Sequence, residues 1–296
     1  MDKKFSRTQI LSLLGILLTT IIWGGGFVIT KNAVGRITPI YMMAARFTIA
    51  CAALPVFYFR KIKLITRADM LPGAALGFWL AAGFITQTYG IKYTTASNSA
   101  FITSFYVVAV PFLNLLFNRA RLRAIHLAAA AMAFAGVLLL SVDGAFRINS
   151  GDALTFVCSF CYAAHIVLLG RYAKKRDVAA LTMLQMLFAA AFCWICAPVF
   201  EGAPGLSILF GGSGLRLISE ILYLALLSTM LGFLLQTSAQ KNLPTATASV
   251  LLTLECVFGS AFSIIFLRDP VGPRNISGFA LMFAAVLVSV LKSPSD

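Results

Sequence analysis

The chain is dominated by apolar stretches about 20 residues long, separated by short segments rich in Pro, Gly, Lys and Arg. A helix needs about 20 apolar residues to cross roughly 30 Å of hydrocarbon, whereas barrel strands alternate apolar and polar residues over about 10 positions. Backbone polar groups inside lipid must be hydrogen-bonded within the protein, so these stretches predict membrane-spanning helices. The composition agrees, because 60% of the residues are apolar and only 11% are charged, against about 25% charged in a soluble domain.

We predict ten spans from these stretches. Residues 201–217, which contain Gly, Pro and Ser, are expected to form an extramembrane loop. Lys3, Lys4 and Arg7 precede the first stretch as they would in a signal peptide, but that stretch continues to about Ile29 without a small-residue cleavage site. We therefore expect it to be a retained span. The ten predicted spans are 9–29, 39–59, 70–90, 97–117, 124–142, 152–170, 179–200, 218–239, 246–266 and 274–291.

The net charge of +14 is concentrated in alternate loops, above all in residues 60–67, 119–123 and 171–176. This distribution is typical of topology signals and lipid-headgroup contacts, and it argues against nucleic acid as a partner. Because the positive side of a membrane protein is the cytoplasmic side, both termini are predicted to be cytoplasmic. The predicted fold class is an all-α polytopic protein of the cell membrane, with the lipid bilayer as its environment.

The sequence also contains an internal repeat. Residues 1–148 and 149–296 are predicted to be two five-span copies, and because five is odd the second copy must be inverted in the membrane. Inverted repeats are typical of transporters, in which two equivalent halves exchange inward-open and outward-open shapes. The polar matches pair Gln87 with Gln236, Thr88 with Thr237 and Lys92 with Lys241 at an offset of 149, and Trp23 with Tyr162 and Arg46 with Gln185 at an offset of 139.

Several stretches resemble the EamA-like family of the drug/metabolite transporter superfamily. They are Trp23-Gly24-Gly25-Gly26-Phe27, Ala45-Arg46-Phe47, Thr95-Ala96-Ser97, Phe105 to Arg121 and Thr245 to Asp269. The resemblance implies ten helices around a central cavity and a carrier of small molecules, and it makes an exporter of amino acids or similar metabolites the expected function, because many members of the family export them. A sugar or nucleotide-sugar carrier of the same superfamily is the alternative.

Arg46 and Glu255 are the two fully charged residues that fall well inside predicted spans. Charges in lipid are costly and are functional candidates by default. Three hypotheses stay open: a structural ion pair or two separately capped charges; a substrate site in which Arg46 binds a carboxylate and Glu255 an ammonium; and proton coupling through Glu255.

Trp23 precedes three consecutive glycines, each of which costs about 1 kcal/mol in a helix relative to Ala. The glycines indicate close helix contact, a hinge in the helix, or a place where substrate approaches the backbone with Trp23 as an aromatic wall. The remaining polar candidates would line a cavity if they face inward, although each could instead make an interhelical hydrogen bond worth about 0.6 kcal/mol. These candidates are Gln87, Tyr106, Tyr162, His165, Gln185 and Gln236.

Other classes of protein fit the chain less well. Cys158-x-x-Cys161 and Cys193-x-x-Cys196 have the spacing of zinc ligands, but both pairs lie in apolar spans, where packing is the expected role of cysteine. We expect no metal and no cofactor. An enzyme would need a nucleophile and a base near each other, and a channel would need a polar pore helix; neither pattern is present. The oligomeric state stays open.

Overall fold

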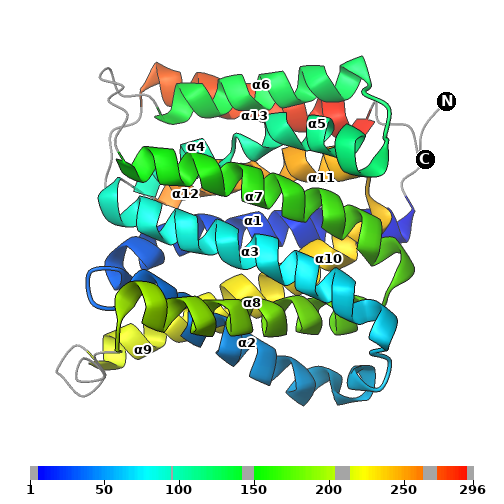
Figure 1. The fold of residues 1–296 in the computed structure, drawn as a ribbon. Helices are drawn as coiled ribbons and strands as arrows, with labels where there is room; N and C mark the ends of the chain where they lie inside the picture. The colour runs from blue at the N-terminus through cyan, green and yellow to red at the C-terminus, as the bar shows by residue number, and fades with distance from the viewer. Residues whose placement is uncertain (1–5, 95, 142–149, 204–213, 263–271, 292–296) are drawn as a thin grey trace.

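The structure is a computed structural model that describes residues 6–94, 96–141, 150–203, 214–262 and 272–291. Within these ranges the regular structure is entirely helical (Figure 1). The helices are α1 (Arg7–Ala33), α2 (Pro39–Ile62), α3 (Arg67–Tyr93), α4 (Ala96–Thr103), α5 (Tyr106–Asn118), α6 (Ala124–Ser141), α7 (Ser150–Tyr172), the 3-10 turn η1 (Ala173–Lys175), α8 (Val178–Glu201), α9 (Gly214–Leu222), the π-helix η3 (Tyr223–Leu231), α10 (Gly232–Asn242), α11 (Thr245–Leu252), α12 (Leu254–Phe262) and α13 (Pro273–Leu291).

Seven helical stretches in the described residues are long and apolar enough to cross a membrane. They coincide with the predicted spans 9–29, 39–59, 70–90, 97–117, 152–170, 179–200 and 218–239. The other three predicted spans coincide with shorter apolar helices, Ala124–Gly136, Thr245–Gly259 and Ile276–Val288. That these three also cross the membrane stays a prediction. Of the predicted loop 201–217, residues 204–213 lie outside the described part of the chain.

Local sequence explains where several helices begin. Ser6 and Gln9 form a reciprocal capping box at the start of α1, and Pro39 occupies the first turn of α2, where its missing N–H costs nothing. Asp177 caps α8 through the amides of Ala179 and Ala180. Burial of Asp177 raises the pKa of its carboxyl, but hydrogen bonds from Lys61 and from these amides outweigh burial and lower the pKa overall.

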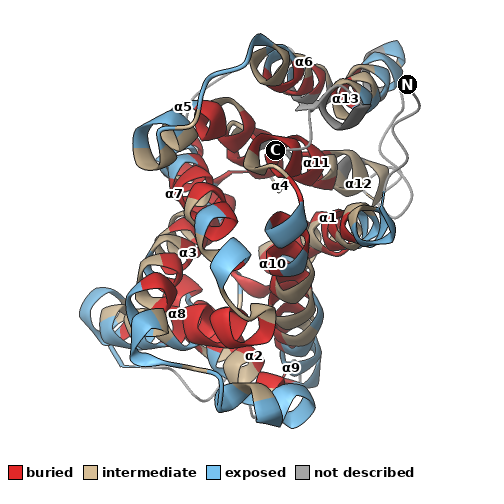
Figure 2. Ribbon diagram, turned by 90° about the vertical axis from the view of Figure 1, so that its right-hand side faces the viewer, coloured by how far each residue is buried: buried red, intermediate tan, exposed pale blue. Residues whose placement is uncertain are grey.

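The helices run side by side, and α6 packs on α13 at one edge of the bundle (Figure 1). Buried residues follow the helix faces turned inward, and most exposed residues lie at the periphery and at the helix ends (Figure 2). The exterior is strongly apolar, with Leu116 70% exposed, Phe200 72% and Leu215 82%. A large exposed apolar surface of this kind matches a lipid environment.

Two helical stretches are interrupted where the sequence predicted continuous spans. One break falls at Ser104 and Phe105, between α4 and α5, and the other at Thr253, between α11 and α12. Ser104 donates its hydroxyl to the carbonyl of Ala100, and Thr253 donates its hydroxyl to that of Val250. Such side-chain bonds to the preceding turn compete with the helical ladder and bend it.

Candidate functional site

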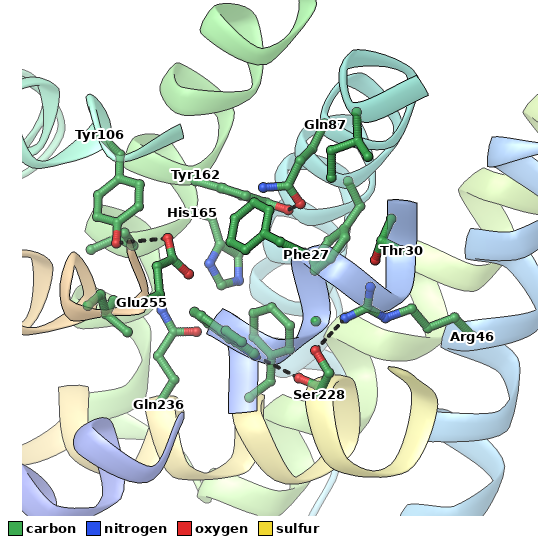
Figure 3. Close-up of a pocket in the computed structure, with 17 residues that line it drawn as sticks. Phe27, Thr30, Arg46, Gln87, Tyr106, Tyr162, His165, Ser228, Gln236 and Glu255 are labelled. Carbon is green, nitrogen blue, oxygen red and sulfur yellow. Dashed lines mark hydrogen bonds between the residues drawn. The ribbon is translucent and has the colours of Figure 1, made fainter. Parts of the chain in front are cut away.

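A cavity lies between the helices of both halves of the chain (Figure 3). It leaves about 50 Å³ for the centres of water molecules. One water needs roughly 10–15 Å³, so the cavity has room for only a few waters and is narrow in this conformation. Its lining residues are Trp23, Gly26, Phe27 and Thr30 of α1; Arg46 of α2; Phe84, Gln87 and Ile91 of α3; Tyr106 of α5; Tyr162, His165 and Ile166 of α7; Ser228 of η3; Phe233 and Gln236 of α10; Leu252 of α11; and Glu255 of α12.

Arg46 forms one polar wall of the cavity. Its side chain is 3% exposed, its Nε donates to the hydroxyl of Thr229, and its Nη2 donates to the hydroxyl of Ser228 at 2.9 Å. The guanidinium also lies 4.4 Å above the centre of the Phe84 ring, a cation–π contact. Both hydroxyls come from the π-helix η3, a conformation that is frequent at functional sites. Neutral partners hold this guanidinium in position without neutralising its charge.

Glu255 forms the opposite wall (Figure 3). It is 4% exposed, and its Oε1 accepts a hydrogen bond from the hydroxyl of Tyr106 at 3.3 Å. No ion pair joins Glu255 to Arg46 in the described structure, so the two charges are not a structural pair. Gln236 lies beside Glu255, and its buried Oε1 accepts no hydrogen bond from the described residues. The carboxylate and this amide oxygen together give the wall two hydrogen-bond acceptors.

Further polar contacts and aromatic rings surround the cavity between the Arg46 wall and the Glu255 wall. Tyr162 donates to Gln87 Oε1 at 3.1 Å, and Gln87 donates in turn to Thr103. The indole of Trp23 donates to the carbonyl of Ser228 at 2.8 Å, and its ring centre lies 5.1 Å from that of Phe233. These contacts fix the aromatic rings around the cavity.

All the predicted site residues line this cavity except Gln185. That residue is fully buried behind the wall, and its Oε1 lies 2.8 Å from Nε2 of His165. It therefore positions a lining residue. Sequence reasoning missed Thr30, Phe84, Ser228 and Phe233. Ser228 could have been found from the sequence, because it and Thr229 are adjacent hydroxyl residues in an apolar stretch. Phe84 and Phe233 could not, because the chain has 25 Phe and the spacing of these residues does not mark the ones that line a cavity.

Gly24 lies at the contact between α1 and α12. A Cβ atom on Gly24 would approach the backbone nitrogen of Gly259 to 2.8 Å and the carbonyl of Glu255 to 3.0 Å. The glycine thus lets α1 pack against the backbone that carries Glu255. Gly26 instead faces the cavity, where an added Cβ would lie 3.5 Å from the Ser228 hydroxyl.

The cysteines do not form a metal site in the described structure. All six are free thiols, and no three His, Cys, Asp or Glu side chains gather closely enough to hold an ion. Cys158 and Cys193 are buried in the packing between helices.

Comparison with known proteins assigns the family. The model of the EamA-like transporter family matches the chain twice, over residues 10–142 and 149–291. The chain belongs to the EamA-like transporter family. It is therefore a transporter and a multi-pass integral protein of the plasma membrane, with a small molecule as its substrate and lipid around it.

Relatives of this EamA-like transporter cover nearly its whole length. An uncharacterized transporter of Archaeoglobus fulgidus is 29% identical over 94% of this chain and 85% of its own. Proteins named probable amino-acid metabolite efflux pumps are 24% identical in Salmonella typhimurium and 21% identical in Escherichia coli, each over 93% of both chains. A crystal structure aligns with a TM-score of 0.75 at 16% identity, covering 95% of this chain and 96% of that one. This last likeness establishes the fold alone.

Proposed function

We propose that this EamA-like transporter exports a small amino-acid-like metabolite by alternating access. In this proposal the substrate's carboxylate binds Arg46 and its ammonium binds Glu255. The single observation that carries the proposal is the presence of two buried, opposite charges on facing walls of one cavity, with no ion pair between them in the described structure.

Arg46 has the geometry needed to bind a carboxylate. Its Nε and Nη2 are held by Thr229 and Ser228, while Nη1 donates to no described residue. A guanidinium presents its donors as a planar fork, which matches a carboxylate. Because its partners are neutral hydroxyls, the positive charge remains available to an anionic group.

The Glu255 wall has the chemistry of an ammonium site. Glu255 Oε1 accepts one bond from Tyr106, and Gln236 Oε1 accepts none from the described residues. An ammonium group brings three donors and no acceptor. It would satisfy the amide oxygen and neutralise the carboxylate, whereas a second anionic or purely acceptor group would leave both unsatisfied.

The proposal includes two inverted five-span halves, residues 1–148 and 149–296, with both termini in the cytoplasm as the positive loops predict. Several contacts support the two halves. Equivalent helices pack in equivalent ways: α3 packs on α7 as α10 packs on α1, and α5 packs on α7 as α12 packs on α1. The family model also matches each half separately. Such an arrangement gives two conformations of similar energy, which alternating access requires.

The position of the helix breaks agrees with the offset of 149. Ser104 and Thr253 are separated by that number, and so are Tyr106 and Glu255, which hydrogen-bond to each other. Interrupted helices at equivalent positions of two repeats are the usual location of a transporter's substrate site. The proposed site thus coincides with the interface at which the two halves would move.

Counterflow into proteoliposomes tests the proposal. Proteoliposomes that contain the purified protein are loaded with unlabelled amino acids, sugars or nucleotide sugars. Uptake of the matching labelled compound is then followed with and without a proton gradient. We expect saturable counterflow with amino acids alone. Counterflow with sugars or nucleotide sugars instead would contradict the proposed substrate, and ohmic single-channel currents would contradict a carrier. A rate of transport that depends on the proton gradient would show that transport is coupled to protons as well.

A further inference from the structure

A second cavity lies at the end of the bundle where α1 begins and α13 ends (Figure 1). It is enclosed by the end of α5, the start of α6, the end of α7 with η1, and the start of α11. About 700 Å³ is open to the centres of water molecules, against about 50 Å³ in the central cavity. We call it the basic pocket, because the charged side chains lining it are Arg119, Arg121, Arg123, Arg171, Lys174 and Lys175.

Among the described residues, the basic pocket differs from the rest of this end of the molecule in having no acidic side chain in its lining. Lys61 pairs with Asp177 at 2.8 Å, and Arg176 pairs with Asp69 at 2.9 Å. By contrast, no Asp or Glu in the described part of the chain lines the basic pocket, and Arg121, Lys174 and Lys175 form no ion pair there. Like charges gathered in this way repel each other, and an anion between them relieves that repulsion.

The backbone brings these side chains together. Arg119 has a φ of 53°, a left-handed conformation that turns the chain sharply at the end of α5. Arg171 then donates to the carbonyl of Phe117 at 3.3 Å and ties the end of α7 to the end of α5. Helix α11 begins at the pocket with Pro244 as its N-cap residue, and the helix dipole also favours an anion at this end.

The surroundings of the pocket favour a lipid over a soluble anion. Within two turns of the helix before Arg119, the surface of α5 carries Phe112 at 52% exposed, Leu115 at 44% and Leu116 at 70%. These side chains lie on the face of α5 turned away from the pocket-lining Asn114, Phe117 and Asn118. The pocket therefore lies at the end of a helix whose other face is exposed and apolar, as a lipid-facing surface would be. Basic pockets between membrane helices are suited to anionic headgroups.

We propose that the basic pocket binds the phosphate headgroup of an anionic phospholipid. This site is separate from the central cavity and does not depend on the proposed substrate.

Native mass spectrometry of the purified full chain tests this proposal with dioleoyl phosphatidylglycerol and dioleoyl phosphatidylcholine, which share acyl chains and differ in headgroup charge. We expect the anionic lipid to bind at least about tenfold more tightly than phosphatidylcholine, and this preference to weaken between about 50 and 500 mM salt. Equal affinity for the two lipids would overturn the proposal. These measurements need only the wild-type protein.

Matched variants then locate the site. The variant R121Q/K174Q/K175Q removes three charges from the pocket, and R60Q/K63Q/R67Q removes three exposed charges from the same end of the molecule but outside the pocket. We expect the first to weaken phosphatidylglycerol binding at least about tenfold and the second less than about twofold. An equal loss in both variants would overturn the assignment to the pocket. Displacement of the lipid by about 10 mM inorganic phosphate would overturn the proposal that a lipid occupies the pocket and would indicate a soluble anion.

Discussion

The two charged residues of the central cavity have neutral counterparts in the other half of the chain. At an offset of 139, Arg46 corresponds to Gln185, and at an offset of 149, Glu255 corresponds to Tyr106. Gln185 lies behind the cavity wall, and Tyr106 serves as the hydrogen-bond partner of Glu255. The two halves therefore contribute a similar scaffold but different charges. A polar substrate with distinct ends can bind such a cavity in one orientation.

Replacing Glu255 with Gln tests the ammonium wall. The amide keeps the shape and the bond from Tyr106 but removes the negative charge, so we expect counterflow of an amino acid to be abolished. Tyr106→Phe removes a single hydrogen bond, worth about 0.6 kcal/mol in a membrane, and should leave substantial transport. Counterflow is measured in proteoliposomes with equal amounts of each protein. Unchanged transport in Glu255→Gln, with normal membrane expression, would rule out both substrate binding and proton coupling by this residue.

Replacing Arg46 with Lys tests the carboxylate wall. Lys keeps the charge but loses the planar fork, so the bonds to Ser228 and Thr229 cannot both be kept while a carboxylate is bound. A hydrogen bond to a charged group contributes about 1.5–3 kcal/mol, so the half-saturating substrate concentration should rise roughly tenfold or more. Arg46→Gln should have a larger effect still. An unchanged half-saturating concentration in both variants would assign Arg46 a structural role.

At the scale of elements, the contact between α1 and α12 connects helix packing to the site. Gly24 packs against the backbone of Gly259 and of Glu255 itself, whereas an added Cβ on Gly26 would make only ordinary van der Waals contact at the cavity. The position of Glu255 thus depends on the absence of a side chain at residue 24 of α1.

Substituting these two glycines separately tests the contact. In Gly24→Ala the new methyl group meets backbone atoms at 2.8 and 3.0 Å, and overpacking of this kind costs about 1–3 kcal/mol. We expect a lower midpoint of thermal unfolding in detergent. Gly26→Ala meets its nearest atom at 3.5 Å and gains helix propensity, so its unfolding midpoint should be unchanged or higher. Equal midpoints for the two variants would mean that α1 and α12 are not in tight contact.

The helical segments could be predicted from the sequence because the length of an apolar stretch is a direct consequence of membrane thickness. The breaks at Ser104 and Thr253 and the π-helix η3 could not. They depend on single hydroxyls bonding to the preceding turn and on tertiary packing, which leave no periodic signal. Arg46 and Glu255 stood out because charge in lipid is rare, while Phe84 and Phe233 did not, because helices apolar all round give no face to choose.

At the scale of the whole molecule, the proposed arrangement predicts which loops face the cytoplasm. Residues 60–67 are expected inside and residues near Arg216 outside, because the positive loops of a membrane protein remain in the cytoplasm. The test places a single cysteine at Lys63 or at Arg216 in a background lacking the native cysteines. A membrane-impermeant maleimide should label Arg216→Cys on intact cells and Lys63→Cys after permeabilisation alone. The reverse pattern would invert the proposed topology.

In the proposed arrangement of two equivalent halves, Arg46 comes from the first half and Glu255 from the second, and both line one cavity. Movement of one half against the other would change the separation of the two charges, and a substrate that bridges them would link binding to that movement. The length and the two charges of the substrate, more than its side chain, should then decide what is carried.

Competition against counterflow by three matched compounds tests this claim most directly: an amino acid, its amine lacking the carboxylate, and its acid lacking the ammonium. The account predicts that the amino acid competes best in the wild type and that removing either charge weakens competition at least about tenfold. In the variants the three compounds are compared by equilibrium binding to the purified protein, which needs no counterflow: Arg46→Gln should no longer distinguish the amino acid from the amine, and Glu255→Gln should no longer distinguish it from the acid. Equal competition by all three compounds in the wild type, or loss of both distinctions in either variant, would contradict it.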